Sequence, residues 1–101
     1  MLHKKSTPGN GQVRVTFTLP YTTHADRVSV LGDFNSWDAT ATPMIQRRLD
    51  ADWVASVELE AGRRYRFRYL LDGKRWLNDW YADDFEDNPF GTTDSVVDLS
   101  P

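Results

Sequence analysis

Several short stretches of the chain alternate apolar and polar residues with a period of two, and this pattern constrains the fold more than any other feature. Such alternation is typical of β-strands with one buried face and one face in water. Turn-forming residues such as glycine, proline and aspartate end most of these stretches. No window of about eleven or more residues shows the apolar stripe of an amphipathic helix. The alternating stretches cover residues 13–19, 28–30, 53–59, 65–71 and 96–99.

Short strands at roughly ten-residue spacing predict an all-β chain of about six to eight strands, folded as an antiparallel β-sandwich. The chain has 101 residues, which is enough for one core. We therefore expect a single domain over residues 12–101, preceded by a flexible leader over residues 1–11 that contains Pro8, Gly9 and Gly11. Residues 78–93 lack a strand pattern and are expected to form a long loop rich in acidic and aromatic side chains.

Aromatic residues are the unusual part of the composition. Four Trp, four Tyr and five Phe make up 13% of the chain, more than a core of this size readily hides, so some must face water. Trp80, Tyr81 and Phe85 lie in the long loop, where they either pack it down or extend a binding site. Inward strand positions assign five rings to the core: Phe17, Trp53, Tyr65, Phe67 and Tyr69.

Charge and cysteine content exclude several classes of function. The net charge of −3 opposes nucleic-acid binding, and the absence of Cys excludes disulfides, zinc–thiolate sites and cysteine nucleophiles. No apolar run is long enough for a membrane span or a signal peptide. We therefore expect a cytoplasmic protein with no membrane or nucleic-acid partner and no cofactor.

Catalytic chemistry has little support in the sequence. Asp79, Asp83, Asp84, Glu86 and Asp87 lie in one polar run, where solvation would keep them all ionised, unlike the acid and base of a glycosidase. The run also lacks the spacing of an EF-hand calcium loop. The two histidines, His3 and His24, are expected to be plain surface residues. The chain is predicted not to be an enzyme.

Two segments are candidates for binding. Residues 32–38 form a turn that carries Trp37, which either offers a surface for stacking or covers the end of the core, where Phe34 is the better core residue. In residues 64–76, alternation sends Arg64, Arg66 and Arg68 outward, close to Trp76. That stripe is either part of a binding surface or an ordinary solvated sheet face.

Four motifs, in order and in register, resemble carbohydrate-binding module family 48, the early-set domain of isoamylases, glycogen branching enzymes and the β subunit of AMP-activated protein kinase. The resemblance covers about residues 12–99 and implies an immunoglobulin-like early-set sandwich. The motifs are Val28–Trp37 (VSVLGDFNSW), Gly62 with Tyr65–Gly73 (YRFRYLLDG), Trp76–Asp79 (WLND) and Phe90–Val97 (FGTTDSVV).

The resemblance further implies non-catalytic binding of α-1,4-linked glucan such as glycogen, starch or maltooligosaccharide. A glycogen-metabolising enzyme or another protein is the expected protein partner. The alternative is a protein-interaction or scaffold domain that has the same fold and has lost sugar binding. Matched by motif, the site comprises two stacking tryptophans, a basic residue, an apolar residue over a sugar ring and two polar contacts, namely Trp37, Trp76, Arg68, Phe90, Thr92 and Asp94.

Two positions depart from the kinase-type pattern. Asp94 stands where that class has Asn, which replaces a donor and acceptor by an acceptor alone. Arg75 adds one residue between Gly73 and Trp76. A slip of one residue turns a strand side chain to the other face, so we expect the turn to absorb the extra residue if Trp76 stays in the site.

Overall fold

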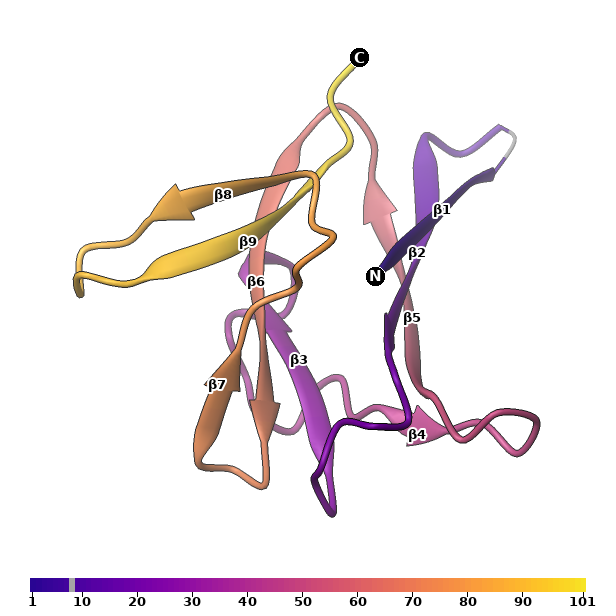
Figure 1. Cartoon of the computed structure of the whole chain (residues 1–101). Helices are drawn as coiled ribbons and strands as arrows, with labels where there is room; N and C mark the ends of the chain where they lie inside the picture. Colours follow the sequence, from indigo (N-terminus) through magenta and orange to yellow (C-terminus); the bar gives the residue numbers. More distant parts are fainter. Residues whose placement is uncertain (8) are drawn as a thin grey trace.

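The computed structural model describes residues 1–7 and 9–101, which form two antiparallel sheets packed as a small β-sandwich (Figure 1). One sheet has the order β1-β2-β5-β4, and the other β3-β6-β9-β8, with β7 paired to β6. This confirms the predicted all-β, immunoglobulin-like class. The elements are β1 (Leu2–Thr7), β2 (Gln12–Leu19), β3 (Val28–Gly32), the 3₁₀ turn η1 (Asp33–Asn35), β4 (Ile45–Gln46), β5 (Trp53–Glu60), β6 (Arg64–Leu71), β7 (Arg75–Leu77), β8 (Asp84–Asp87) and β9 (Thr93–Asp98).

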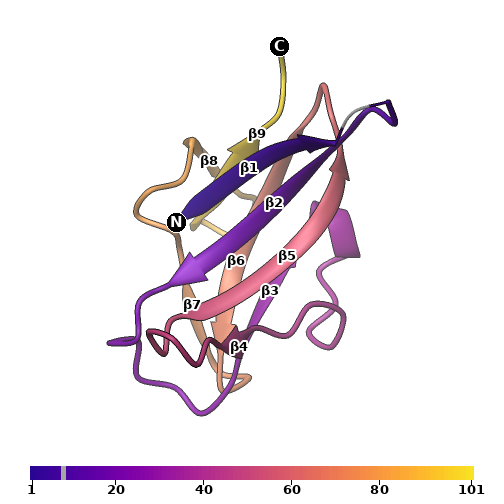
Figure 2. The ribbon, with the colours of Figure 1, turned by 90° about the vertical axis from the view of Figure 1, so that its right-hand side faces the viewer.

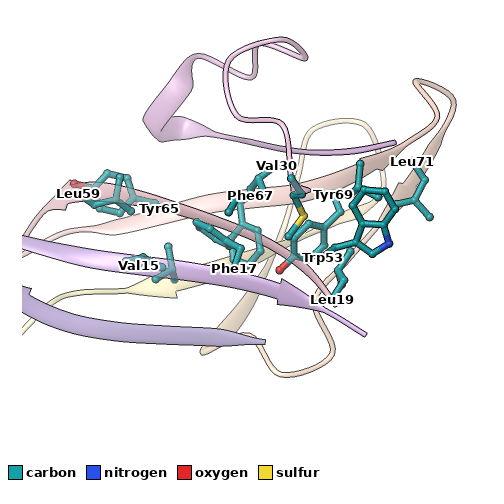
Figure 3. Close-up of a cluster of buried hydrophobic side chains, with 14 residues drawn as sticks. Val15, Phe17, Leu19, Val30, Trp53, Leu59, Tyr65, Phe67, Tyr69 and Leu71 are labelled. Atoms are coloured by element: carbon teal, nitrogen blue, oxygen red, sulfur yellow. The ribbon is translucent and has the colours of Figure 1, made fainter. Parts of the chain in front are cut away.

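The core lies between the sheets, with β1, β2 and β5 in front of β3 and β6 in Figure 2. Phe17 of β2 and Phe67 of β6 are both fully buried, and their ring centroids lie 4.9 Å apart (Figure 3). Phe34 of η1 stacks on Phe17 from the partly buried edge of the core. All five rings assigned to the core from the sequence are buried: Phe17, Trp53, Tyr65, Phe67 and Tyr69.

The N-terminal segment differs from the expected flexible leader. Leu2–Thr7 forms β1, which pairs antiparallel with β2 from Leu2 opposite Phe17 to Thr7 opposite Gln12. Lys4 also forms an ion pair with Asp83 at 2.6 Å. Charged side chains are common on edge strands because they discourage further pairing, and they hide the apolar alternation that reveals a strand. Pro8 of the expected leader lies outside the described residues.

The expected loop at residues 78–93 contains a strand, β8, paired antiparallel with β9. Arg64 of β6 offsets the repulsion among the acidic side chains of β8 and β9. Its guanidinium forms ion pairs with Asp84 at 2.7 Å, Glu86 at 3.1 Å and Asp98 at 2.9 Å. These contacts raise the pKa of Arg64, first through Asp84 and then through Glu86.

Asp79 is not the solvated carboxylate that the polar run predicts, since it is only 1% exposed. Its carboxylate accepts hydrogen bonds from the Tyr69 hydroxyl at 2.7 Å and from the amino group of Met1, and its backbone amide donates to Ser95 Oγ at 2.8 Å. Burial, followed by the charge of Asp79, raises the pKa of Tyr69 well above its ordinary value. Asp79 therefore anchors the β7–β8 connection to the core.

Candidate functional site

An open groove of about 850 Å³ lies over the outward face of β6, between the loop after β3 and the tip of the β8–β9 hairpin. In Figure 1 this tip projects away from β1, β2 and β5. All six residues predicted for a site line the groove, although they come from four separate stretches of chain. The lining consists of Leu31, Trp37, Ala39, Arg66, Arg68, Leu70, Trp76, Asn88, Pro89, Phe90, Thr92 and Asp94.

A tight turn holds Trp37 at one wall of the groove. Its backbone has a left-handed φ of 56°, which is unusual for a bulky residue and persists only where neighbours enforce it. The Trp37 amide donates to the Gly32 carbonyl at 3.0 Å, and its indole Nε1 donates to Asp33 Oδ1 at 3.1 Å. The Asn35 side chain closes the turn by accepting from the Gly32 amide at 3.0 Å and donating to the Val30 carbonyl at 2.9 Å.

Gly32 is required by close approach rather than by its φ. Its φ is −167°, an extended value open to any residue. A Cβ at this position would lie 2.5 Å from the Arg66 carbonyl oxygen and 2.7 Å from Phe34 Cε1. The absence of a side chain therefore lets the Trp37 turn lie directly against β6.

Asp33 links this turn to β6 electrostatically. Burial alone raises its pKa, but hydrogen bonds from the Arg66 amide and side chain and from the Trp37 indole outweigh burial, so the net pKa is below its ordinary value. The Arg66 amide donates to Asp33 Oδ2 at 2.8 Å. The pKa of Arg66 is raised, chiefly by its hydrogen bond to Asp33. Asp33 is therefore ionised and links the Trp37 indole to β6 through hydrogen bonds.

Arg68 and Trp76 form the floor of the groove. The Arg68 guanidinium carbon lies 5.0 Å from the centroid of the Trp76 ring, a cation–π distance. Arg68 Nε lies 4.0 Å from Asp94 Oδ1, is buried and has no hydrogen-bond partner. Trp76 remains 46% exposed, whereas the Asp94 side chain is 6% exposed. Asp94 therefore lies beneath the floor, next to a guanidinium with unused hydrogen-bonding capacity.

The β6–β7 turn absorbs the extra residue before Trp76. Asp72 and Gly73 both adopt positive φ, at 55° and 68°, as the Asp-Gly turn signal predicts. Trp76 consequently pairs with Leu70, which belongs to the same outward-facing set of β6 as Arg68. Trp76 therefore stays on the groove face.

Asn88 organises the hairpin tip that carries Phe90. Its Oδ1 accepts from the Phe90 amide at 3.0 Å and the Thr92 amide at 3.2 Å, while its Nδ2 donates to Thr92 Oγ1 at 2.7 Å and Asp94 Oδ1 at 3.1 Å. Phe90 itself is 90% exposed. One side chain therefore fixes three of the predicted site residues relative to one another.

Asp94 is the one carboxylate among the described residues that line the groove. The lining therefore lacks the pair of opposed acids that a glycosidase uses. The described residues contain no group of three or more His, Asp or Glu side chains positioned to hold a metal ion. Nor does their structure include a helix whose length and apolar character suit a membrane crossing.

Comparison with known families identifies relatives of this sandwich. Residues 3–82 match the family described as Carbohydrate-binding module 48 (Isoamylase N-terminal domain). The chain belongs to this family. The match begins within β1, as expected if that strand is part of the module, and it ends before the hairpin tip with Phe90, Thr92 and Asp94.

Curated relatives of this family 48 module include proteins named 1,4-alpha-glucan branching enzyme GlgB. The one from Aquifex aeolicus (strain VF5) is 43% identical over 61 residues, covering 57% of this chain and 9% of the relative. Those from Burkholderia pseudomallei (strain 668) and Burkholderia cenocepacia (strain HI2424) are 52% identical over 44 residues and 48% over 52 residues, covering 43% and 50% of this chain. The module spans less than a tenth of each relative, at 9%, 6% and 7% of their lengths.

Sequence reasoning missed several lining residues of the module. Asn88 had a usable signal, because Asn before Pro initiates turns and its side chain bonds the backbone that follows. Leu31 and Leu70 carry no such signal in the sequence. An outward leucine on a strand looks the same in sequence whether it lies at the edge of the core or lines a groove that distant loops form. The Trp80 and Tyr81 rings lie outside the groove lining and are 86% and 72% exposed.

Proposed function

We propose that this module binds α-1,4-linked glucan non-catalytically, with the sugar chain lying in the groove between Trp37, Trp76 and Phe90. The observation that carries the proposal is the convergence of exposed aromatic surface with Arg68 and Asp94 in one open groove. One face of a glucose ring is lined by C–H groups and stacks on an indole, while its hydroxyls extend sideways to polar groups. Membership of a carbohydrate-binding family supports the same ligand class.

Each groove residue has a role in this proposal. Trp37 and Trp76 stack against sugar rings, and Phe90 reaches over a ring from the hairpin tip. The Arg68 side chain is 18% exposed, and its terminal guanidinium nitrogens donate to sugar hydroxyls. Thr92 is exposed and bonds sugar hydroxyls at the groove edge. Asp94 acts from beneath the floor, where its carboxylate holds Asn88 and Arg68 in position for the sugar.

The expected affinity is weak. If each of two stacks removes on the order of 100 Å² of apolar surface, stacking contributes about 5 kcal/mol at ~25 cal/mol/Å². Association costs roughly 4 kcal/mol or more, so a single module binds in about the micromolar to millimolar range even with hydrogen bonds. Useful retention then depends on the many equivalent sites of a polymer.

Native gel electrophoresis with glycogen in the gel tests this proposal. We expect glycogen to retard the wild-type protein and the Trp76→Ala variant to migrate as it does without glycogen. Trp80→Ala is the matched control, because Trp80 is exposed outside the groove and its loss should leave retardation unchanged. Circular dichroism confirms that each variant is folded. Equal wild-type mobility with and without glycogen would overturn the proposal.

A second candidate is a protein-interaction domain without sugar binding. The exposed Trp80 and Tyr81 rings favour it, because exposed aromatic residues are enriched at protein interfaces. The same gels separate the two candidates. A protein-interaction domain would show no glycogen retardation in any variant.

A further inference from the structure

A second, smaller cavity of about 300 Å³ adjoins the groove at the end nearest the β6–β7 turn. Leu70 and Ala39 line both spaces, so these two side chains lie at the boundary between them. The remaining lining comes from Arg27, Ser29, Thr40 and Gly73.

Strand register places the second cavity in line with the stacking floor. Leu70 of β6 pairs with Trp76 of β7 on one side and with Ser29 of β3 on the other. Paired residues in antiparallel strands point to the same face. Trp76, Leu70 and Ser29 therefore form one row across the outward face of the sheet, leading from the groove into the second cavity.

The second cavity has a largely apolar lining, and a few of its side chains carry unused hydrogen-bonding groups. The Arg27 carbonyl accepts from the Asp72 amide at 2.9 Å and the Arg27 amide donates to Asp72 Oδ1 at 3.0 Å, which fixes Arg27 beside the hairpin turn. The Arg27 side chain remains exposed. Within the described chain, neither the Arg27 guanidinium nor the Ser29 hydroxyl has a hydrogen-bond partner. Thr40 donates its hydroxyl to Asp38 at 2.8 Å and keeps acceptor capacity. Such groups suit neutral polyols.

An anionic ligand fits this cavity less well. The Asp72 carboxylate lies beside Arg27, and Asp38 lies beside Thr40, so acidic groups flank the single cation of the lining. Both carboxylates have a pKa below the ordinary value because of hydrogen bonds from neighbouring amides and, for Asp38, from Thr40. They are therefore ionised at neutral pH and would repel phosphate.

We propose that the second cavity is an extension subsite, in which a glucan longer than the groove crosses Leu70 and its hydroxyls bond Arg27 and Ser29. This inference rests on the proposed glucan binding. It makes the module selective for chain length, because a short maltooligosaccharide fills the aromatic groove and a longer one fills both spaces.

Isothermal titration calorimetry with maltotriose and maltoheptaose tests the extension subsite. We expect Arg27→Ala and Ser29→Ala each to weaken maltoheptaose binding by about two- to tenfold while leaving maltotriose binding within twofold of wild type. A longer sugar binds more tightly simply because it offers more binding registers. Comparing each variant with wild type for the same sugar cancels this effect. Lys74→Ala is the matched control. Lys74 is an exposed cation in the β6–β7 turn, close to Arg27, but it does not line the cavity.

The outcomes separate the two proposals. Unchanged maltoheptaose affinity in both variants would overturn the extension subsite and leave glucan binding intact. Equal weakening for both sugars would also overturn it, because Arg27 or Ser29 would then act in the main groove. Absence of wild-type binding to either sugar would overturn the proposed function itself.

Discussion

At the scale of single residues, small side chains around the 33–37 turn decide where Trp37 lies. Gly32 allows contact with β6, Asn35 closes the turn and Asp33 holds the indole. The strained φ of Trp37 has a physical cause in these three contacts. None of them touches the space of the groove, so their effect on binding acts through Trp37.

We expect Gly32→Ala to destabilise the fold by roughly 1–3 kcal/mol, because the added Cβ overpacks an already filled site. The Cβ would lie 2.5 Å from the Arg66 carbonyl oxygen and 3.0 Å from Phe67 Cβ, and neither atom can move without shifting β6. Urea unfolding followed by tryptophan fluorescence measures the change. An unfolding free energy equal to that of wild type would show that the turn does not press against β6.

The ionised state of Asp33 should make part of the stability depend on pH. An unfolded aspartate has a pKa of about 3.9, and the folded Asp33 pKa is lower. The carboxylate therefore stabilises the fold above about pH 4, and this contribution is lost as the pH falls through the folded pKa. Urea midpoints of wild type and Asp33→Asn should differ at pH 7 and converge below about pH 4. A constant difference across this range would contradict the assignment.

At the scale of elements, alternation predicted the buried strands well and the edge strands poorly. β2, β5 and β6 each bury one face, so their apolar residues recur at every second position. β1 and β8 are edge strands rich in charge, and the partners that stabilise them are distant in sequence, as with Arg64 and Asp84. Local sequence does not show such partners, and for this reason no strand is predicted in either segment from the sequence.

Removing residues 1–7 tests whether β1 belongs to the sandwich. We expect the unfolding free energy to fall by roughly 1–3 kcal/mol, because Leu2 packs against the core and the ladder with β2 is lost. Urea unfolding of the shortened chain is the measurement. A flexible leader would leave the unfolding free energy unchanged.

Arg64→Ala should loosen β8, because Asp84, Glu86 and Asp98 would face one another without their shared cation. Amide hydrogen exchange should accelerate at residues 84–87 and stay at wild-type rates in the centre of β6. Arg14→Ala is the matched control, because Arg14 pairs with Glu58 on the other sheet. Equal exchange at residues 84–87 in wild type and both variants would show that Arg64 does not hold the strand.

At the scale of the whole molecule, the sandwich brings the Trp37 turn, the Arg68–Trp76 floor and the hairpin tip with Phe90 together on one face. The six predicted site residues share the groove because the motifs lie in register on this fold. Burial of Asp94 and the role of Asn88 could not be predicted, since both depend on how the hairpin folds over β6. The adjoining cavity depends likewise on the packing of Ala39 and Leu70.

The four tryptophans make the central claim directly measurable, because two line the groove and two do not. Trp53 is buried in the core and Trp80 is exposed elsewhere. In a ¹H–¹⁵N NMR titration with maltoheptaose, we expect the indole signals of Trp37 and Trp76 to shift saturably while those of Trp53 and Trp80 stay in place. Four unmoved signals, or a shift confined to Trp80, would contradict glucan binding in the groove.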